Sequence, residues 1–175
     1  NDCNVDNSYG VGADALGQVW LSGWECPYAL GYNTAGKFWC RASLPFRQKV
    51  GRGIAGDLNG NVWAALGGDS QSYLASWSGG ECQANETYTV PRSGIMPGPW
   101  GANGPTGVNV DASGKVWLSH YLSPVLMSVD TLNGNDTKAW QTNNVYSFSD
   151  ATGVVRQLSI GSGSFVQDYE SPCEN

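Results

Sequence analysis

The stretch Gly53-Ile-Ala-Gly-Asp57-Leu-Asn-Gly60-Asn-Val62-Trp63 decides the fold, because the chain carries this phrase three times. The other copies run from Gly10 to Trp20 and from Gly107 to Trp117, at offsets of 43 and 54 residues. A weaker fourth copy lies at Asp150–Val155, with Arg156 in the Trp position. A period of this size, with a turn signal between two short apolar segments, is typical of stacked four-stranded units.

Each copy predicts a strand, a tight turn and a second strand. The turn Asp accepts backbone hydrogen bonds, and the turn Gly takes the positive φ that reverses the chain. The second strand is apolar at consecutive positions, as in Val62-Trp63-Ala64, which predicts a strand covered on both faces. Third and fourth strands are expected at Tyr28–Tyr32 and Phe38–Leu44, at Tyr73–Trp77 and Thr87–Val90, and at Val125–Val129 and Thr137–Gln141.

The sequence therefore predicts an all-β fold, a β-propeller of four-stranded antiparallel blades in one domain spanning 1–175. The blades are expected at about 10–48, 53–92, 107–142 and, in degenerate form, 146–170. Six repeat residues are interpreted as structural, with the tryptophans packed between blades: Asp14, Trp20, Asp57, Trp63, Asp111 and Trp117. A closed four-bladed ring and a partial ring completed by a second copy or another chain both remain open, and the partial ring is favoured.

The phrase Gly104-Pro-Thr-Gly-Val108 followed by Asp-x-x-Gly-x-Val-Trp resembles blades of the NHL and virginiamycin B lyase type of propeller. The resemblance runs from Gly10 to about Gln141 and implies the fold. For the lyases it also implies a catalytic histidine with acidic partners and a metal. His120 stands here where that family has its site glutamate, and the chain has no second histidine. His120, whose matching positions are Gly23 and Leu66, is thus the one catalytic candidate.

Composition narrows the class of partner. Charged residues make up 14% of the chain and the net charge is −6, which argues against binding to a nucleic-acid backbone. No apolar run approaches the length of a membrane span. Five cysteines without C-x-x-C spacing predict disulfides in an extracellular, periplasmic or cell-surface protein. The expected pairs are Cys26 with Cys40 and Cys3 with Cys173, which leaves Cys82 unpaired and indicates either a partner on another chain or a segment of a longer protein.

The sequence favours a non-catalytic binding module over an enzyme. Aromatic residues near loops are typical of contact surfaces for protein or carbohydrate, and the candidates are Trp24, Trp100, His120 and Tyr121. The alternatives are a metal-assisted lyase or hydrolase that uses His120, and a structural subunit of an extracellular assembly. No cofactor is expected, although Asp57–Asn61 keeps a calcium ion as a further alternative.

Overall fold

The computed structural model describes residues 8–23, 26–44, 49–67, 73–97, 105–120, 125–130 and 136–141. These residues form strands and turns, with two short 3-10 turns, η2 (Gly79–Glu81) and η3 (Arg92–Gly94), and without an α-helix. The predicted all-β class is confirmed. Within the same ranges there is no helix of the length and hydropathy that a membrane crossing requires.

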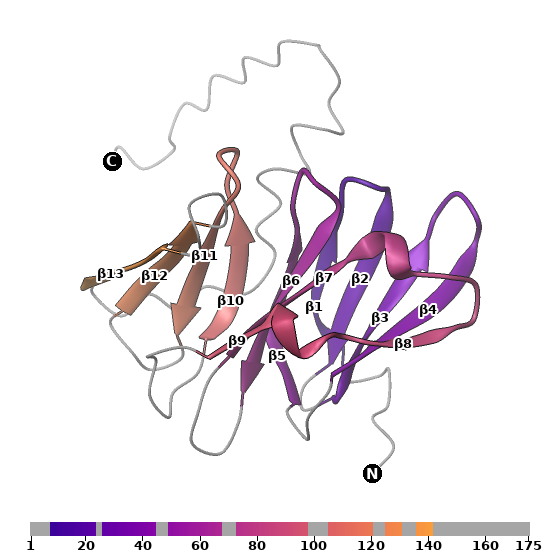
Figure 1. Ribbon diagram of the computed structural model, residues 1–175, viewed down its shortest axis with the longest axis horizontal. Coiled ribbons are helices and arrows are strands. Elements are labelled where there is room, and N and C mark those ends of the chain that lie inside the picture. The colour runs from indigo at the N-terminus through magenta and orange to yellow at the C-terminus, as the bar shows by residue number, and fades with distance from the viewer. Residues whose placement is uncertain are drawn as a thin grey trace, which may run out of the picture.

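Three sheets of consecutive strands lie side by side, as neighbouring fans in Figure 1. The first sheet contains β1 (Ser8–Ala13), β2 (Gln18–Gly23), β3 (Tyr28–Asn33) and β4 (Phe38–Ser43). The second contains β5 (Lys49–Gly56), β6 (Asn61–Gly67), β7 (Tyr73–Ser78) and β9 (Ile95–Pro97). The third contains β10 (Pro105–Val110), β11 (Lys115–His120), β12 (Val125–Asp130) and β13 (Asp136–Gln141). All of these pairings are antiparallel.

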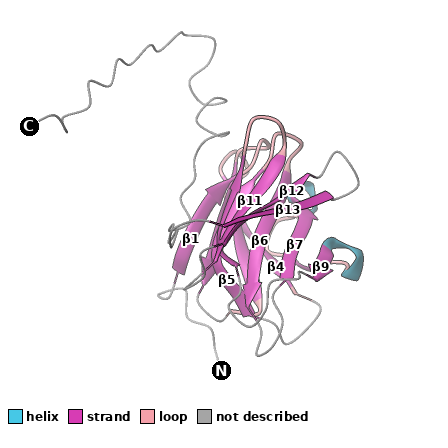
Figure 2. Ribbon diagram, turned by 90° about the vertical axis from the view of Figure 1, so that its left-hand side faces the viewer, coloured by secondary structure: helices cyan, strands magenta, loops and turns pink. Residues whose placement is uncertain are grey.

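The repeated phrase forms the inner hairpin of each sheet, and the three turns lie at the same end of the molecule (Figure 2). The turn glycines Gly17, Gly60 and Gly114 have φ of 77°, 78° and 81°, a region that side chains with a Cβ rarely enter. The inner strands also approach closely, since a Cβ at Gly12 would lie 2.6 Å from the carbonyl oxygen of Ile54. Small residues in the first strand are therefore a packing requirement.

The core lies in two layers, one on each side of the second sheet. Val62, Ala64 and Leu66 of β6 face the first sheet, while Trp63 and Ala65 face the third. The expectation of a second strand covered on both faces is thus confirmed for β6. For β2 it is wrong, because buried and half-buried residues alternate along that strand. The reason is that β2 packs against a described sheet on one face only.

The fourth strand of the second sheet differs from the prediction. The expected segment Thr87–Val90 forms β8 (Thr87–Thr89), which pairs in parallel with β4 of the first sheet. The place beside β7 is taken by β9. Residues 79–94 cross in front of the first two sheets (Figure 1), and we call them the strap. The strap covers the exposed edge of β4, a common protection for edge strands.

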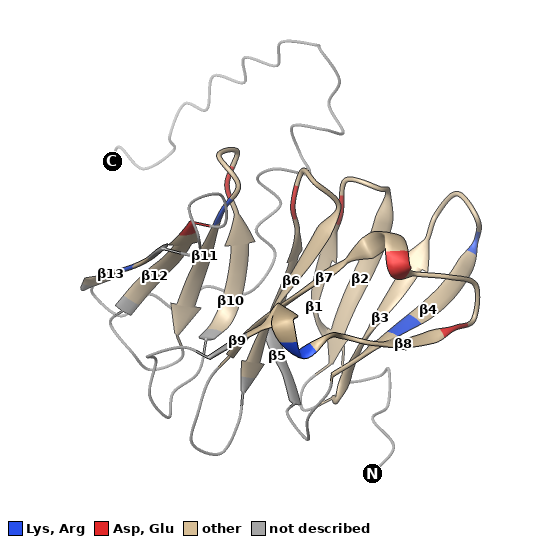
Figure 3. Ribbon diagram, viewed as in Figure 1, with Lys and Arg blue, Asp and Glu red and all other residues tan. Residues whose placement is uncertain are grey.

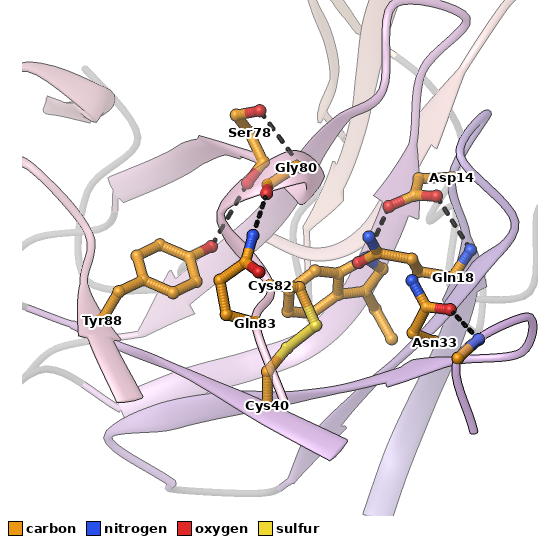
Figure 4. Close-up of a disulfide and its surroundings, with 11 residues drawn as sticks. Asp14, Gln18, Asn33, Cys40, Ser78, Gly80, Cys82, Gln83 and Tyr88 are labelled. Atoms are coloured by element: carbon orange, nitrogen blue, oxygen red, sulfur yellow. Dashed lines mark hydrogen bonds between the residues drawn. A yellow bond between two sulfur atoms is a disulfide. The ribbon is translucent and has the colours of Figure 1, made fainter. Parts of the chain in front are cut away.

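The strap also corrects the cysteine pairing. Cys40 of β4 is bonded to Cys82 of the strap, with a sequence separation of 42 residues (Figure 4). Cys26 is in a disulfide as well, with a partner outside the described residues. The predicted pair Cys26–Cys40 and the predicted unpaired Cys82 are therefore wrong. The strand pattern did not predict that the strap crosses from the second sheet to the first. The predicted pair Cys3–Cys173 lies outside the described residues.

Candidate functional site

The repeated Asp and Trp form a hydrogen-bonded clasp across each inner hairpin. In the second sheet, Asp57 Oδ1 accepts from the backbone N–H of Asn59 and Asn61 at 2.9 and 2.8 Å. Asp57 Oδ2 accepts from the Trp63 indole N–H at 2.9 Å. The Trp20–Asp14 and Trp117–Asp111 distances are 2.8 and 2.7 Å. Each clasp fixes the turn and holds the indole against the sheet.

The clasp uses both carboxylate oxygens of each repeat aspartate as hydrogen-bond acceptors. Both oxygens of each repeat Asp already accept from N–H groups, as a carboxylate does in a structural role. In the part of the chain that the structure describes, no three metal-binding side chains come together. Acidic positions mark the turn end of all three sheets in Figure 3. The hairpin turns at that end of the molecule are each fixed by hydrogen bonds to an aspartate. A calcium ion at Asp57–Asn61 stays a prediction.

Asp111 differs from its counterparts in its exposure to solvent. Partial burial raises the pKa of its carboxyl, but hydrogen bonds from the Ser113 hydroxyl, the Trp117 indole and the backbone N–H groups of Lys115 and Ser113 outweigh burial. The net result is a pKa below the ordinary value for aspartate. The clasp of the third sheet therefore favours the charged carboxylate.

His120 is the last residue of β11 and is only 2% exposed. It follows Val116 and Leu118 at alternate positions, and both of these pack in the core against the second sheet. Its counterpart in β6 is Leu66, which is a fully buried core residue. The one histidine of the chain is thus buried, at the end of the strand face that carries Val116 and Leu118. The other predicted site residues, Trp24, Trp100 and Tyr121, lie outside the described residues.

A second feature is the face of the first sheet that points away from the second sheet, which we call the first-sheet outer face. Two cross-strand rows cover it. One joins Val11, Leu21 and Leu30, and the other joins Val19, Tyr32 and Trp39. Val11 and Trp39 are 49% and 46% exposed, and the other four are half-buried. Large apolar side chains therefore reach solvent together on one side of a sheet.

Aromatic contacts organise the outer edge of this face. The rings of Tyr32 and Trp39 lie 4.8 Å apart, and the Arg41 guanidinium lies 4.3 Å from the centre of the Tyr28 ring. A shallow groove of about 280 Å³ runs beside Trp39 toward the strap. Its lining residues are Leu30, Trp39, Cys40, Arg41, Asn85, Glu86 and Thr87. Aromatic and polar groups thus share the rim of the first-sheet outer face.

The third sheet has a corresponding face, the third-sheet outer face, formed by Asn109, Trp117 and Trp140. Trp117 stacks on Trp140 with ring centres 5.2 Å apart, and Trp140 is 39% exposed. Asn109 pairs in register with Trp117. Within the described chain, the buried Oδ1 of Asn109 has no hydrogen-bond partner. This face therefore carries an aromatic pair beside a buried amide oxygen.

The residues on the two outer faces are equivalent in register to the residues that meet at the junctions between neighbouring sheets. The register places Val19 and Leu21 where β6 has Val62 and Ala64, the side chains that face the preceding sheet. Tyr32 stands where the second sheet has Trp77, whose ring meets Trp20 edge-on at 5.6 Å. Sequence reasoning missed this surface, although alternating apolar residues in Tyr28–Tyr32 were a readable signal.

The sequence matches no protein-family model and no curated protein. Solved structures with the same arrangement include a streptogramin B lyase, with 14% identity, a TM-score of 0.58, and coverage of 81% of this chain and 43% of that one. Virginiamycin B lyase from Staphylococcus aureus has 15% identity, a TM-score of 0.54, and coverage of 83% and 45%. A chain of a mitotic checkpoint complex has 8% identity, a TM-score of 0.56, and coverage of 78% and 39%.

At these identities the likeness concerns the fold, and the chain spans less than half the length of the structures that it matches. The sheet order, the repeated hairpins and the solved neighbours agree with one another. The resemblance read from the sequence is confirmed at the level of architecture. This chain has a β-propeller fold like that of the virginiamycin B lyases, with three sheets of a partial propeller in its described part.

Proposed function

We propose that this chain is a secreted or cell-surface propeller that acts as a non-catalytic protein-interaction module through its first-sheet outer face. The exposure of Val11 and Trp39, at 49% and 46%, carries the proposal. These side chains continue into rows with half-buried Leu21, Leu30 and Tyr32. A contiguous apolar patch of this kind on a soluble domain marks a site of interaction.

Two further observations support the proposal. His120 is only 2% exposed, whereas a general base needs to reach its substrate. The Cys40–Cys82 disulfide and the bonded Cys26 favour an oxidising compartment, where such bonds persist. The virginiamycin B lyases are enzymes, but at 14–15% identity they lend this chain their architecture only.

A photo-crosslinking side chain at Val11 tests the proposal in the medium or periplasmic extract of the producing cells. The matched control is Leu58, which is 43% exposed but lies in the β5–β6 turn, away from the face. We expect covalent attachment to a protein chain from position 11, none from position 58, and loss of the product when Leu21→Arg is added. Equal products from both positions would contradict the proposal.

Carbohydrate is the competing ligand class, because Trp39 lies beside the polar groups of Asn85, Glu86 and Thr87. A panel of soluble oligosaccharides, titrated by calorimetry against the chain and its Trp39→Ala variant, decides between the two. We expect no saturable heat. Saturable binding that Trp39→Ala removes would assign the face to sugar and overturn the protein-binding role.

A further inference from the structure

We infer that the partner on the first-sheet outer face is a second copy of this chain, with its third sheet packed there head to tail. The inference rests on the proposed function, and it names the partner. It follows from a comparison of the two outer faces with the two junctions that the chain already contains.

Each internal junction is built in the same way. The Trp of one sheet packs on alternate apolar positions of the next sheet. Trp20 packs with Val62, Ala64, Leu66 and Trp77, and Trp63 packs with Val116, Leu118 and Val129. The equivalent positions on the first sheet are Val19, Leu21 and Tyr32. The first-sheet outer face thus has the receiving half of a junction.

The third-sheet outer face has the donating half. Trp117 is held by Asp111 as Trp20 and Trp63 are held by their own aspartates, and it is only partly buried. Asn109 occupies the position of Gly12, whose Cβ direction points at the Ile54 carbonyl of the next sheet. In a head-to-tail pair, Asn109 would therefore lie opposite Val11 of the second copy, and because its side chain is larger than the glycine at position 12, the two strands would stand further apart than β1 and β5 do.

Two copies of the described sheets would make a ring of ordinary size. The matched span covers 43% and 45% of the two lyase chains, so two such spans would cover most of a chain of that length. Two copies of the three described sheets would give six, within the usual range of four to eight blades. Head-to-tail contact of two copies forms a closed ring when the rotation between them closes, and both outer faces are then covered.

The oligomeric state of the purified full chain is the first test, by native mass spectrometry and sedimentation at micromolar concentration. We expect a dimer, and a dissociation constant raised about 30-fold or more by Leu21→Arg, as for a central contact residue. Circular dichroism of Leu21→Arg checks that the variant folds. Leu58→Arg is the matched control and should leave the dimer unchanged. A wild-type monomer, or equal weakening by both variants, would overturn the inference.

Single-cysteine variants test the direction of packing independently of affinity. Val11→Cys and Asn109→Cys, mixed and mildly oxidised, should give a covalent heterodimer, because the two positions face each other head to tail. Val11→Cys alone should give no covalent homodimer. A homodimer of Val11→Cys would show face-to-face packing and overturn the arrangement.

The two proposals fail in different ways. If the purified chain is a monomer and position 11 attaches to a different protein in the native extract, the second copy is wrong and the interaction role stands. If position 11 attaches only within the same molecule, for example to residues 142–175, both proposals are wrong.

Discussion

The second and third sheets carry the same phrase and form the same hairpin, but they bury it to different extents. The Trp63–Asp57 and Trp117–Asp111 hydrogen bonds measure 2.9 and 2.7 Å. The turn glycines have φ of 78° and 81°. Yet Trp63 is 6% exposed, while Trp117 is only partly buried and stacks on the exposed Trp140. The phrase thus specifies local geometry, whereas burial depends on a neighbouring sheet.

Because of this difference, Trp63 and Trp117 should contribute unequally to the free energy of unfolding. The hydrophobic contribution of a side chain scales with the apolar area that it removes from water. Trp63 is almost fully buried between two sheets. Trp117 is half-buried and stacks on Trp140 of its own sheet. Substitutions at equivalent positions therefore separate what the hairpin contributes from what the junction contributes.

The largest difference is expected between Trp63→Ala and Trp117→Ala. Trp63→Ala removes a large side chain from a closed core and should lower the free energy of unfolding by about 3–5 kcal/mol. Trp117→Ala should cost about half as much or less in a monomeric Leu21→Arg background, because less apolar area is lost. Urea unfolding followed by circular dichroism measures both. Equal losses would mean that Trp117 is covered as completely as Trp63.

The disulfide provides the next comparison, because it joins β4 of the first sheet to the strap that leaves the second sheet. Cys40→Ala with Cys82→Ala opens a loop of 42 residues and should cost about 2–4 kcal/mol. Amide exchange should accelerate in β4 and β8, where the strap pairs with the first sheet, and remain unchanged in β11 and β12. Faster exchange across the third sheet as well would show that the two junctions are not independent.

The carboxylates of the clasps can be compared in the same way. Asp57→Asn retains one oxygen for the backbone donors but turns an N–H toward the buried Trp63 indole. It should cost about 2–3 kcal/mol, since a buried donor is left without an acceptor. Asp111→Asn should cost about 1 kcal/mol, because water can reach the half-buried clasp of the third sheet. The reverse order in urea unfolding would contradict the burial argument.

The sequence predicted what is local and repeated. Asp-x-x-Gly-x-Val-Trp contains its own turn residues and hydrogen-bond partners, so the inner hairpins followed from it. The β3, β4, β7, β12 and β13 strands followed from separate apolar segments between Gly-bearing turns. The strap did not follow, because β8 pairs with β4 across a separation that strand periodicity does not encode. Cys82 was misassigned for the same reason. The first-sheet outer face was missed because an apolar row resembles core until the neighbouring sheets are placed.

The smallest predicted effect is the acid response of the third clasp. The pKa of Asp111 is lowered from its ordinary value in the folded chain, since its hydrogen bonds outweigh the opposing effect of burial. The folded state therefore gains stability from this carboxylate above the ordinary pKa and loses it as the pH falls through the folded pKa. Partial exposure keeps the gain small. An NMR titration of the Asp111 carboxyl should give a midpoint below the ordinary pKa of an aspartate, and Trp117→Phe, which removes one donor, should raise that midpoint. An ordinary or raised midpoint in the wild type, or no change in the variant, would show that the Asp–Trp clasp does not hold the third hairpin in solution.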